Sequence, residues 1–286
     1  MDRRVSAVRI PSQRAVIDRR RLAAAIAEAV AATGVQKARP RIVELLRAAL
    51  EGGREELTRR LAAHPSAGHE IAHGHAFLAD QLIRVLHDHV VADMFPLAKR
   101  GKADRLTLIA VGGYGRGEMA PHSDVDIAFI TPGKTPAWAE QVIEALLYYL
   151  WDLGLKVGHS SRSLDEMVRM AKADLTIRTA ILEGRYLWGN QTLYEEASKR
   201  FWSDVVPGSE AQFVSEKLAE RNARHLRMGD SRYVVEPNVK DGKGGLRDLQ
   251  TLYWIGKYIH RVRDPAELAT VGLFTPEEYG TFRRAG

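Results

Sequence analysis

Apolar residues recur along the first third of this chain with the period of an α-helix. The longest such pattern covers about residues 69–95 and is ended by Pro96. Its apolar positions at helical spacing are Phe77, Leu78, Leu82, Ile83, Leu86, Val90 and Val91. Shorter patterns predict helices over residues 20–32, 40–50 and 55–63, with breaks at Gly34 and at the Gly52–Gly53 pair. Because residues 1–18 show no clear periodicity, we expect an arm or tail followed by four helices.

Two short apolar runs in the middle of the chain have a pattern typical of buried strands. The first covers residues 106–111 and stops at two glycines, and the second covers residues 127–130. A helical pattern over residues 136–153, ended by a glycine, leads to a third expected strand over residues 155–161. The order strand, strand, helix, strand indicates a small mixed sheet. We therefore predict an α+β fold organised around a hairpin-like unit formed by the two apolar runs.

The remainder of the chain has helical patterns again. Helices are expected over residues 164–170, 175–187, 193–201, 210–228 and 246–260. We expect three regions: an N-terminal helical segment (1–68), a core (69–188) and a second helical region (189–286). The last residues, 281–286, stop inside an apparent helix, so we expect the chain to be a fragment of a longer protein.

Composition narrows the class of protein. The 286 residues include no Cys, which excludes a disulfide framework and thiolate chemistry. Lys and Arg number 42 against 36 Asp and Glu, a net charge of +6. This modest excess suits an enzyme that handles nucleoside triphosphates, and it also suits weak nucleic-acid binding. We expect no stable nucleic-acid partner. The chain has no apolar run of about 18 residues and no apolar segment after its N-terminus, so we expect a cytoplasmic protein without a membrane partner.

The candidate chemistry lies between the first two strands. Asp124 and Asp126 are two residues apart, so on a strand their carboxylates would point to the same face while Val125 and Ile127 enter the core. A hard divalent cation would relieve their repulsion, and magnesium prefers carboxylates supplemented by substrate phosphates. We predict that both residues are catalytic and bind Mg²⁺, with Mn²⁺ as a possible substitute. The alternative interpretation is a turn in which one Asp caps the strand.

Gly112 and Gly113 precede this pair by about ten residues. Without a Cβ they would let a triphosphate approach the backbone, and a short helix beginning after them would direct N–H groups at an anion. This arrangement of strands, glycines and carboxylates resembles the nucleotidyltransferase superfamily with a polymerase-β-like fold. The dinucleotide motif G-x-G-x-x-G fails at Glu118, and the P-loop motif fails because Gly244 follows Lys243.

A glycine-rich stretch near the C-terminus, residues 235–248, carries three cations and leads into the last long helix. Lys240, Lys243 and Arg247 together with a helix N-terminus would form a polyphosphate cradle. The alternative is a solvated loop whose glycines serve a tight turn.

One further motif is interpreted as structural. Residues 69–73, H-E-I-A-H, match the zincin pattern, but Ala76 and Ala79 occupy the positions of its required glycine and third histidine. We expect an exposed helix start there, and interpret His87–Asp88 as the polar face of the same helix.

Four motifs together resemble the family of bifunctional uridylyltransferase/uridylyl-removing enzymes that modify the nitrogen-signalling PII protein. They are G-G-Y-G-R-G-E at 112–118, S-D-V-D-I at 123–127, V-G-H-S-S-R at 157–162 and E-P-N-V-K-D-G-K-G-G-L-R-D-L-Q at 236–250. The resemblance covers about residues 70–286. It implies UTP as donor, a PII tyrosine as acceptor and pyrophosphate as product. It also implies that the family's hydrolase and glutamine-sensing domains lie outside this chain, which alone would not be bifunctional.

The resemblance also implies roles for residues. Asp124 and Asp126 would bind the metal, and the tyrosine oxygen would attack the α-phosphorus of UTP in line. The nucleotide would be held by Gly112, Gly113, Arg116, Ser123, Lys240, Lys243 and Arg247. Many superfamily members have a third carboxylate on the strand after the intervening helix, and this strand has none. Asp152, Asp174 and Glu183 are candidates elsewhere, and His159 is interpreted as structural, so the general base stays unassigned.

Two other functions stay open at this point. The first is a relative that transfers AMP to a protein or adds nucleotides to RNA, because an Asp-x-Asp pair does not distinguish UTP from ATP. The second is a signalling module that binds PII or nucleotide without catalysis.

Overall fold

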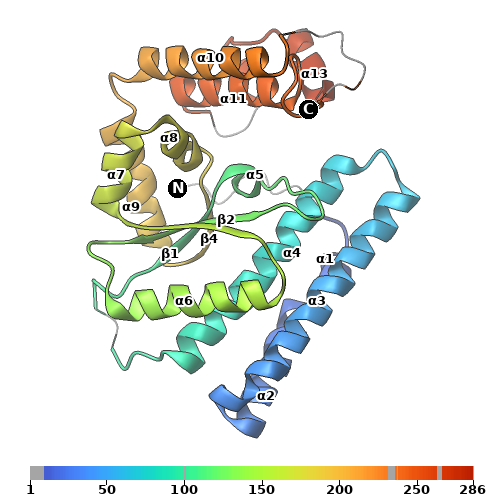
Figure 1. Ribbon diagram of the computed structural model, residues 1–286, viewed down its shortest axis with the longest axis vertical. Helices are drawn as coiled ribbons and strands as arrows, with labels where there is room; N and C mark the ends of the chain where they lie inside the picture. Colours follow the sequence, from blue (N-terminus) through green and yellow to red (C-terminus); the bar gives the residue numbers. More distant parts are fainter. Residues whose placement is uncertain (1–9, 100, 231–235, 237, 263–265, 286) are drawn as a thin grey trace. The chain divides into compact units, whose positions relative to one another are not determined.

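The computed structural model describes residues 10–99, 101–230, 236, 238–262 and 266–285. The chain forms two compact units (Figure 1). The sheet unit contains Val8–Arg169 and Glu183–Lys199, and the helical unit contains Met170–Leu182 and Arg200–Gly286. The predicted division of the chain into regions 1–68, 69–188 and 189–286 stays a prediction. None of the described helices combines the length and the hydropathy needed to cross a membrane.

A four-stranded mixed sheet is the centre of the sheet unit, which confirms the predicted α+β fold. Its strands lie in the order β3-β2-β1-β4. β1 pairs antiparallel with β2 and β4, whereas β3 runs parallel to β2 after the crossover helix α6. The bounds are β1 Thr107–Ala110, β2 Val125–Thr131, α6 Ala137–Asp152, β3 Val157–Ser163 and β4 Arg185–Gly189.

Helices cover one face of this sheet. α4 (Gly68–His89) and α6 share an apolar core with Leu108 of β1 and Phe129 of β2, both fully buried. The short helix α5 (Gly112–Gly115) follows β1, and its Tyr114 is buried in the same core as α4 (Figure 1). Behind α4 pack α2 and α3, and the remaining N-terminal elements are short. Their bounds are α1 Gln13–Val16, α2 Arg19–Thr33, α3 Val35–Ala63 and the π-helix η1 Val90–Met94.

Two predicted boundaries are wrong. The Gly52–Gly53 pair does not break a helix, because α3 continues from Val35 to Ala63. Gly53 serves a close approach instead: a Cβ there would lie 2.6 Å from a methyl carbon of Leu78 and 2.8 Å from the carbonyl oxygen of Val16.

The second error concerns the helix expected over residues 175–187. Helix α8 ends at Leu182, and Arg185–Gly189 forms β4. Pairing with β1, burial of Leu187 and the 2.7 Å ion pair between Arg185 and Asp80 of α4 stabilise this edge strand. Tertiary contacts therefore override the local helical pattern.

The helical unit contains α8 (Leu175–Leu182), α10 (Glu210–Arg227) and α11 (Leu246–His260), as well as shorter pieces. Phe213 of α10 stacks on Tyr258 of α11 with their ring centroids 4.0 Å apart. The helices expected near residues 164, 193, 210 and 246 are confirmed. The remaining elements are α7 Leu164–Ala173, α9 Gln191–Arg200, the π-helix η2 Phe201–Val205, α12 Glu267–Thr270 and α13 Pro276–Ala285.

Candidate active site

The glycine pair and the second aspartate meet where β1 ends. The N–H of Val111 donates to the carbonyl oxygen of Asp126 at 3.0 Å, so Gly112 begins directly beside Asp126. Gly112 has φ of +61°, a left-handed conformation that favours glycine, and opens helix α5. Within the part of the chain that the structure describes, the N–H groups of Gly112, Gly113 and Tyr114 donate to no acceptor. The predicted short helix is present, but it begins at the glycines themselves and not after them.

The Asp126 carboxylate occupies a space that two glycines leave open. A Cβ on Gly112 would lie 3.2 Å from its Oδ2, and a Cβ on Gly158 would lie only 2.1 Å from its Oδ1. Gly158 is the register partner of Asp126 on the parallel strand β3. Any side chain at Gly158 would therefore displace the carboxylate. Sequence reasoning missed this role, although a glycine inside a strand often marks a close approach.

The two aspartates are electrostatically coupled. Asp124 is exposed and lies one residue before β2, whereas Asp126 is partly buried within it. Burial, and after it the negative charge of Asp124, raises the pKa of the Asp126 carboxyl above its ordinary value. No described side chain forms an ion pair with either carboxylate. The pair therefore concentrates negative charge without a neutralising partner.

This donor set fits a divalent cation. Across the described residues there is no group of three or more His, Cys, Asp or Glu side chains able to hold a metal ion. Binding of Mg²⁺ by Asp124 and Asp126 stays a prediction. Magnesium is typically bound through one or two carboxylates, with substrate phosphates and water completing its coordination.

The three candidate carboxylates considered for a third ligand have other partners. Asp152 pairs with Arg39 at 2.7 Å, and Asp174 accepts from the N–H of Ile177 at 2.8 Å, which caps α8. Glu183 is buried and pairs with Arg116 at 2.5 Å. Strand β3 has no Asp or Glu, as the sequence indicated. It therefore lacks the third carboxylate that many superfamily members have on the corresponding strand.

Arg116 lies beside the glycine turn, since a Cβ on Gly113 would be 3.6 Å from its Nη2. Its guanidinium is held by Glu183 and, at 2.9 Å, by Glu118. Burial alone would lower its pKa, but the charges of Glu183 and Glu118 raise it above the ordinary value. Ser123 closes a turn: its hydroxyl accepts from the N–H of Ala120 at 2.9 Å. The roles of both residues in binding phosphates stay predictions.

His159 faces away from the carboxylates. It is opposite Ile127, whose side chain belongs to the core between sheet and helices, and its ring lies 6.2 Å from that of Trp151 on α6.

The histidines of the H-E-I-A-H segment contact each other, with 3.0 Å between the Nε2 atoms of His69 and His73.

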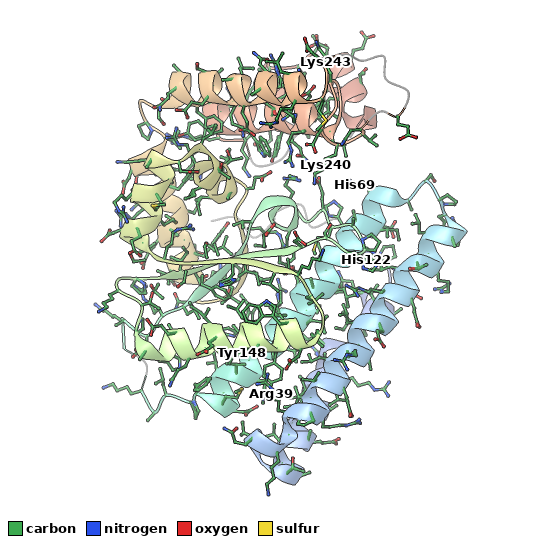
Figure 2. All side chains as sticks on the ribbon, viewed as in Figure 1. Arg39, His69, His122, Tyr148, Lys240 and Lys243 are labelled. Carbon is green, nitrogen blue, oxygen red and sulfur yellow. The ribbon has the colours of Figure 1, made fainter. Side chains whose placement is uncertain are left out.

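The glycine-rich stretch lies in the helical unit, where residues 235 and 237 fall outside the described residues. The side chain of Asn238 accepts from the N–H groups of Lys240 and Asp241, and Asp248 accepts from the N–H of Gly244 at 2.7 Å. Figure 2 labels the two lysines of this stretch. Lys243 pairs with Asp230 at 2.9 Å, Arg247 donates to Gln250 at 2.9 Å, and Lys240 is exposed. Their role as a polyphosphate cradle stays a prediction.

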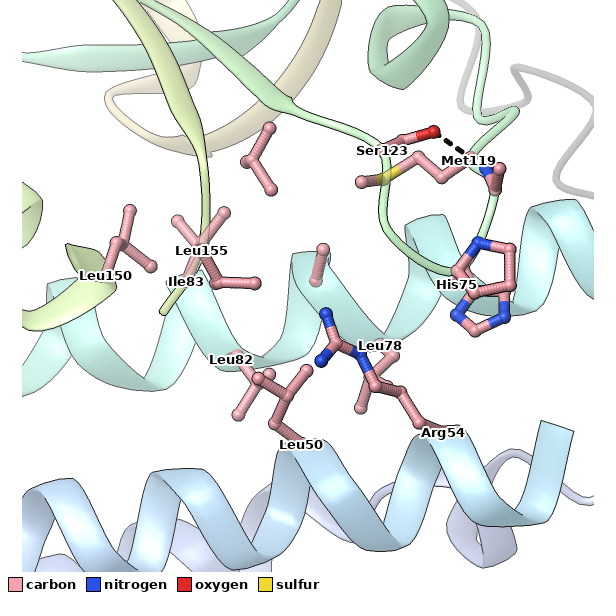
Figure 3. Close-up of a pocket in the computed structure, with 14 residues that line it drawn as sticks. Leu50, Arg54, His75, Leu78, Leu82, Ile83, Met119, Ser123, Leu150 and Leu155 are labelled. Carbon is pink, nitrogen blue, oxygen red and sulfur yellow. Dashed lines mark hydrogen bonds between the residues drawn. The ribbon is translucent and has the colours of Figure 1, made fainter. Parts of the chain in front are cut away.

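A separate pocket between α3, α4 and the turn before β2 is too small for a nucleotide (Figure 3). Its volume of about 20 Å³ has room for roughly one water molecule. His75 lines it, and burial, followed by the charges of Arg54 and His122, lowers the pKa of His75 to about 4. This histidine is therefore neutral at pH 7.

Two family models match parts of this chain. The family model described as "Putative nucleotidyltransferase DUF294" matches residues 53–172, which contain the carboxylate pair, and that described as "GlnD PII-uridylyltransferase" matches residues 212–286. The chain is 69% identical over 277 residues to the bifunctional uridylyltransferase/uridylyl-removing enzyme of Novosphingobium aromaticivorans. It is 64% identical to that of Erythrobacter litoralis and 49% to that of Rhodospirillum rubrum. Each match covers 97% of this chain and 30% of the relative.

The chain thus spans about 30% of the length of the curated relatives it matches. The resemblance predicted from the four motifs is confirmed over nearly all of the chain, including the helical N-terminal third that carried none of them. Over nearly its whole length, the chain is therefore homologous to part of the bifunctional uridylyltransferase/uridylyl-removing enzymes.

Proposed function

We propose that this chain transfers UMP from UTP to a tyrosine of the PII signalling protein and releases pyrophosphate. The observation that carries the proposal is the coupled pair Asp124 and Asp126, which forms no ion pair with any described side chain and lies beside a glycine turn whose N–H groups have no acceptor among the described residues. The names of the relatives support UTP as donor and PII as acceptor.

The site would act with Mg²⁺ or Mn²⁺ held by Asp124 and Asp126. When bound, such an ion lowers the pKa of an attacking hydroxyl and neutralises charge on the departing pyrophosphate. Gly158 allows the Asp126 carboxylate to lie against β3, which supports its role as a ligand of the ion.

The remaining residues would bind and orient the triphosphate. The N–H groups at Gly112 and Gly113 would donate to its phosphate oxygens, and Ser123 and Arg116 would approach from the turn that follows. As the bond between the tyrosine oxygen and the α-phosphorus forms, the bond to pyrophosphate breaks on the opposite side. The role of Lys240, Lys243 and Arg247 in binding phosphates stays a prediction from the sequence. A cytoplasmic location accompanies this proposal, because UTP is the donor.

The test is transfer of label from α-labelled UTP to purified PII, with Mg²⁺ or Mn²⁺ and with labelled ATP in parallel. We expect labelled PII from UTP alone and an adduct on tyrosine by mass spectrometry. Transfer from ATP would replace this proposal with adenylyl transfer. Binding of UTP without transfer from either nucleotide would identify a non-catalytic module.

A further inference from the structure

The outer edge of β3 is open. β3 is the terminal strand of the sheet, and no described strand pairs with its other side. Lys156 accepts from the N–H of Val125 of β2 at 2.8 Å, so the even-numbered residues of this strand direct their backbone groups toward β2. The odd-numbered residues Val157, His159 and Ser161 therefore direct theirs outward, and among the described residues none of these groups has a hydrogen-bond partner.

Apart from the charge of Arg162, this edge lacks the features that normally protect a sheet from pairing. Its seven residues run in unbroken register with β2, and they include no Pro, no Lys and no bulge. Gly158, His159 and Ser161 are exposed. Natural proteins usually block such an edge, because it is a template for another strand. An open edge of this kind is a recognised mode of peptide binding by strand addition.

Two exposed aromatic side chains border the same edge. Tyr148 and Trp151 of α6 are 48% and 46% exposed, and their rings meet edge to face at 5.6 Å (Figure 2 labels Tyr148). Trp151 in turn lies 6.2 Å from His159. Exposed tyrosine and tryptophan are favoured as anchors in protein interfaces. Side chains of an added strand that point toward the helical face would contact this pair.

The opposite face of an added strand would meet the candidate active site. The Asp126 carboxylate lies against Gly158, which is one strand spacing of about 4.8 Å from the position of an added strand. Side chains of paired residues point to the same face of a sheet, so the residue opposite Gly158 would project toward the carboxylates. A hydroxyl carried there would come close to the metal ligands.

We propose that the outer edge of β3 binds the acceptor protein as an added strand, which presents its hydroxyl-bearing residue beside Asp126. This inference rests on the proposed function, because it takes PII as the acceptor. An extended polypeptide complements alternating N–H and C=O groups. Arg162 and the preceding Lys156, with no acid on β3, suit a neutral or acidic segment.

The test compares proline and alanine at one outward-facing position. Ser161→Pro removes an outward N–H and leaves the β2–β3 hydrogen bonds in place, whereas Ser161→Ala changes only the side chain. We expect the proline variant to weaken PII binding by about tenfold or more in calorimetry, and the alanine variant to stay within about twofold of the parent. Binding of UTP should be equal in all three. Equal PII affinity of the two variants, or no binding of PII by the parent, would overturn the proposal.

Controls separate folding, self-association and catalysis. If far-UV circular dichroism shows that Ser161→Pro is unfolded, the pair His159→Pro and His159→Ala makes the same comparison. If gel filtration shows a dimer of the parent that only the proline variant loses, while PII binding is unchanged, the edge pairs with a second copy and the proposal fails. Edge-dependent PII binding without UMP transfer would support docking and reject the proposed function. UMP transfer to PII at equal rates in the parent and the proline variant would support the proposed function and reject docking at this edge.

Discussion

Gly158→Ala should disable the site without unfolding the protein. The added Cβ would lie 2.1 Å from Asp126 Oδ1, whereas ordinary van der Waals contact begins at 3.4 Å, so the carboxylate must retreat by about 1.3 Å (3.4 minus 2.1). A displacement of about 1 Å in a catalytic group can lower a rate by about 100-fold. We therefore expect UMP transfer to PII to fall by about two orders of magnitude.

The assay is steady-state transfer together with Mn²⁺ binding followed by electron paramagnetic resonance. Both should weaken, because the displaced carboxylate is a proposed metal ligand. Gly52→Ala is the matched control, since a Cβ there meets nothing within 4 Å. Transfer within about threefold of the parent in Gly158→Ala, at normal Mn²⁺ affinity, would refute the reasoning.

Three further predictions follow from the described contacts. Gly53→Ala should destabilise the fold by about 1–3 kcal/mol because its Cβ meets Leu78, whereas Gly52→Ala should stabilise it by up to about 1 kcal/mol; urea denaturation compares the two. The pKa of His75 is lowered to about 4 in the folded state. As the pH falls below about 6.5, this histidine is therefore protonated in the unfolded state before it is protonated in the folded state. The parent should therefore lose about 1–2 kcal/mol more stability than His75→Gln between pH 7 and pH 5, and equal losses would contradict this assignment. In Asp124→Asn the pKa of the Asp126 carboxyl should fall, because one negative charge that raises it is removed; carboxyl NMR titration without metal measures it.

The sequence predicted the elements that carry regular patterns. The apolar runs that became β1 and β2, the helix α6 and the strand β3 follow from periodicity and glycine breaks, and the position of the carboxylate pair follows from them. β4 was not predictable in this way, because R-Y-L-W-G becomes a strand only through its pairing with β1 and the contact of Arg185 with Asp80.

The contacts of single residues could also not be predicted from the sequence. A glycine pair indicates a helix break, but only the packing of α3 against α4 reveals that Gly53 is required for close approach. Likewise Arg116 is paired with Glu183, which lies 67 positions later in the chain. Gly158 illustrates the same limit, because its closeness to Asp126 depends on the parallel register of β2 and β3.

The central claim is that Asp124 and Asp126 act as one metal-dependent transfer site. Single-turnover transfer from α-labelled UTP to PII should be measured for the parent, Asp124→Asn, Asp126→Asn and the double variant. Because groups that act as a unit have non-additive effects, each single variant should lose nearly as much rate as the double variant. Single losses that multiply to give the loss of the double variant, or transfer that survives both substitutions, would contradict the account.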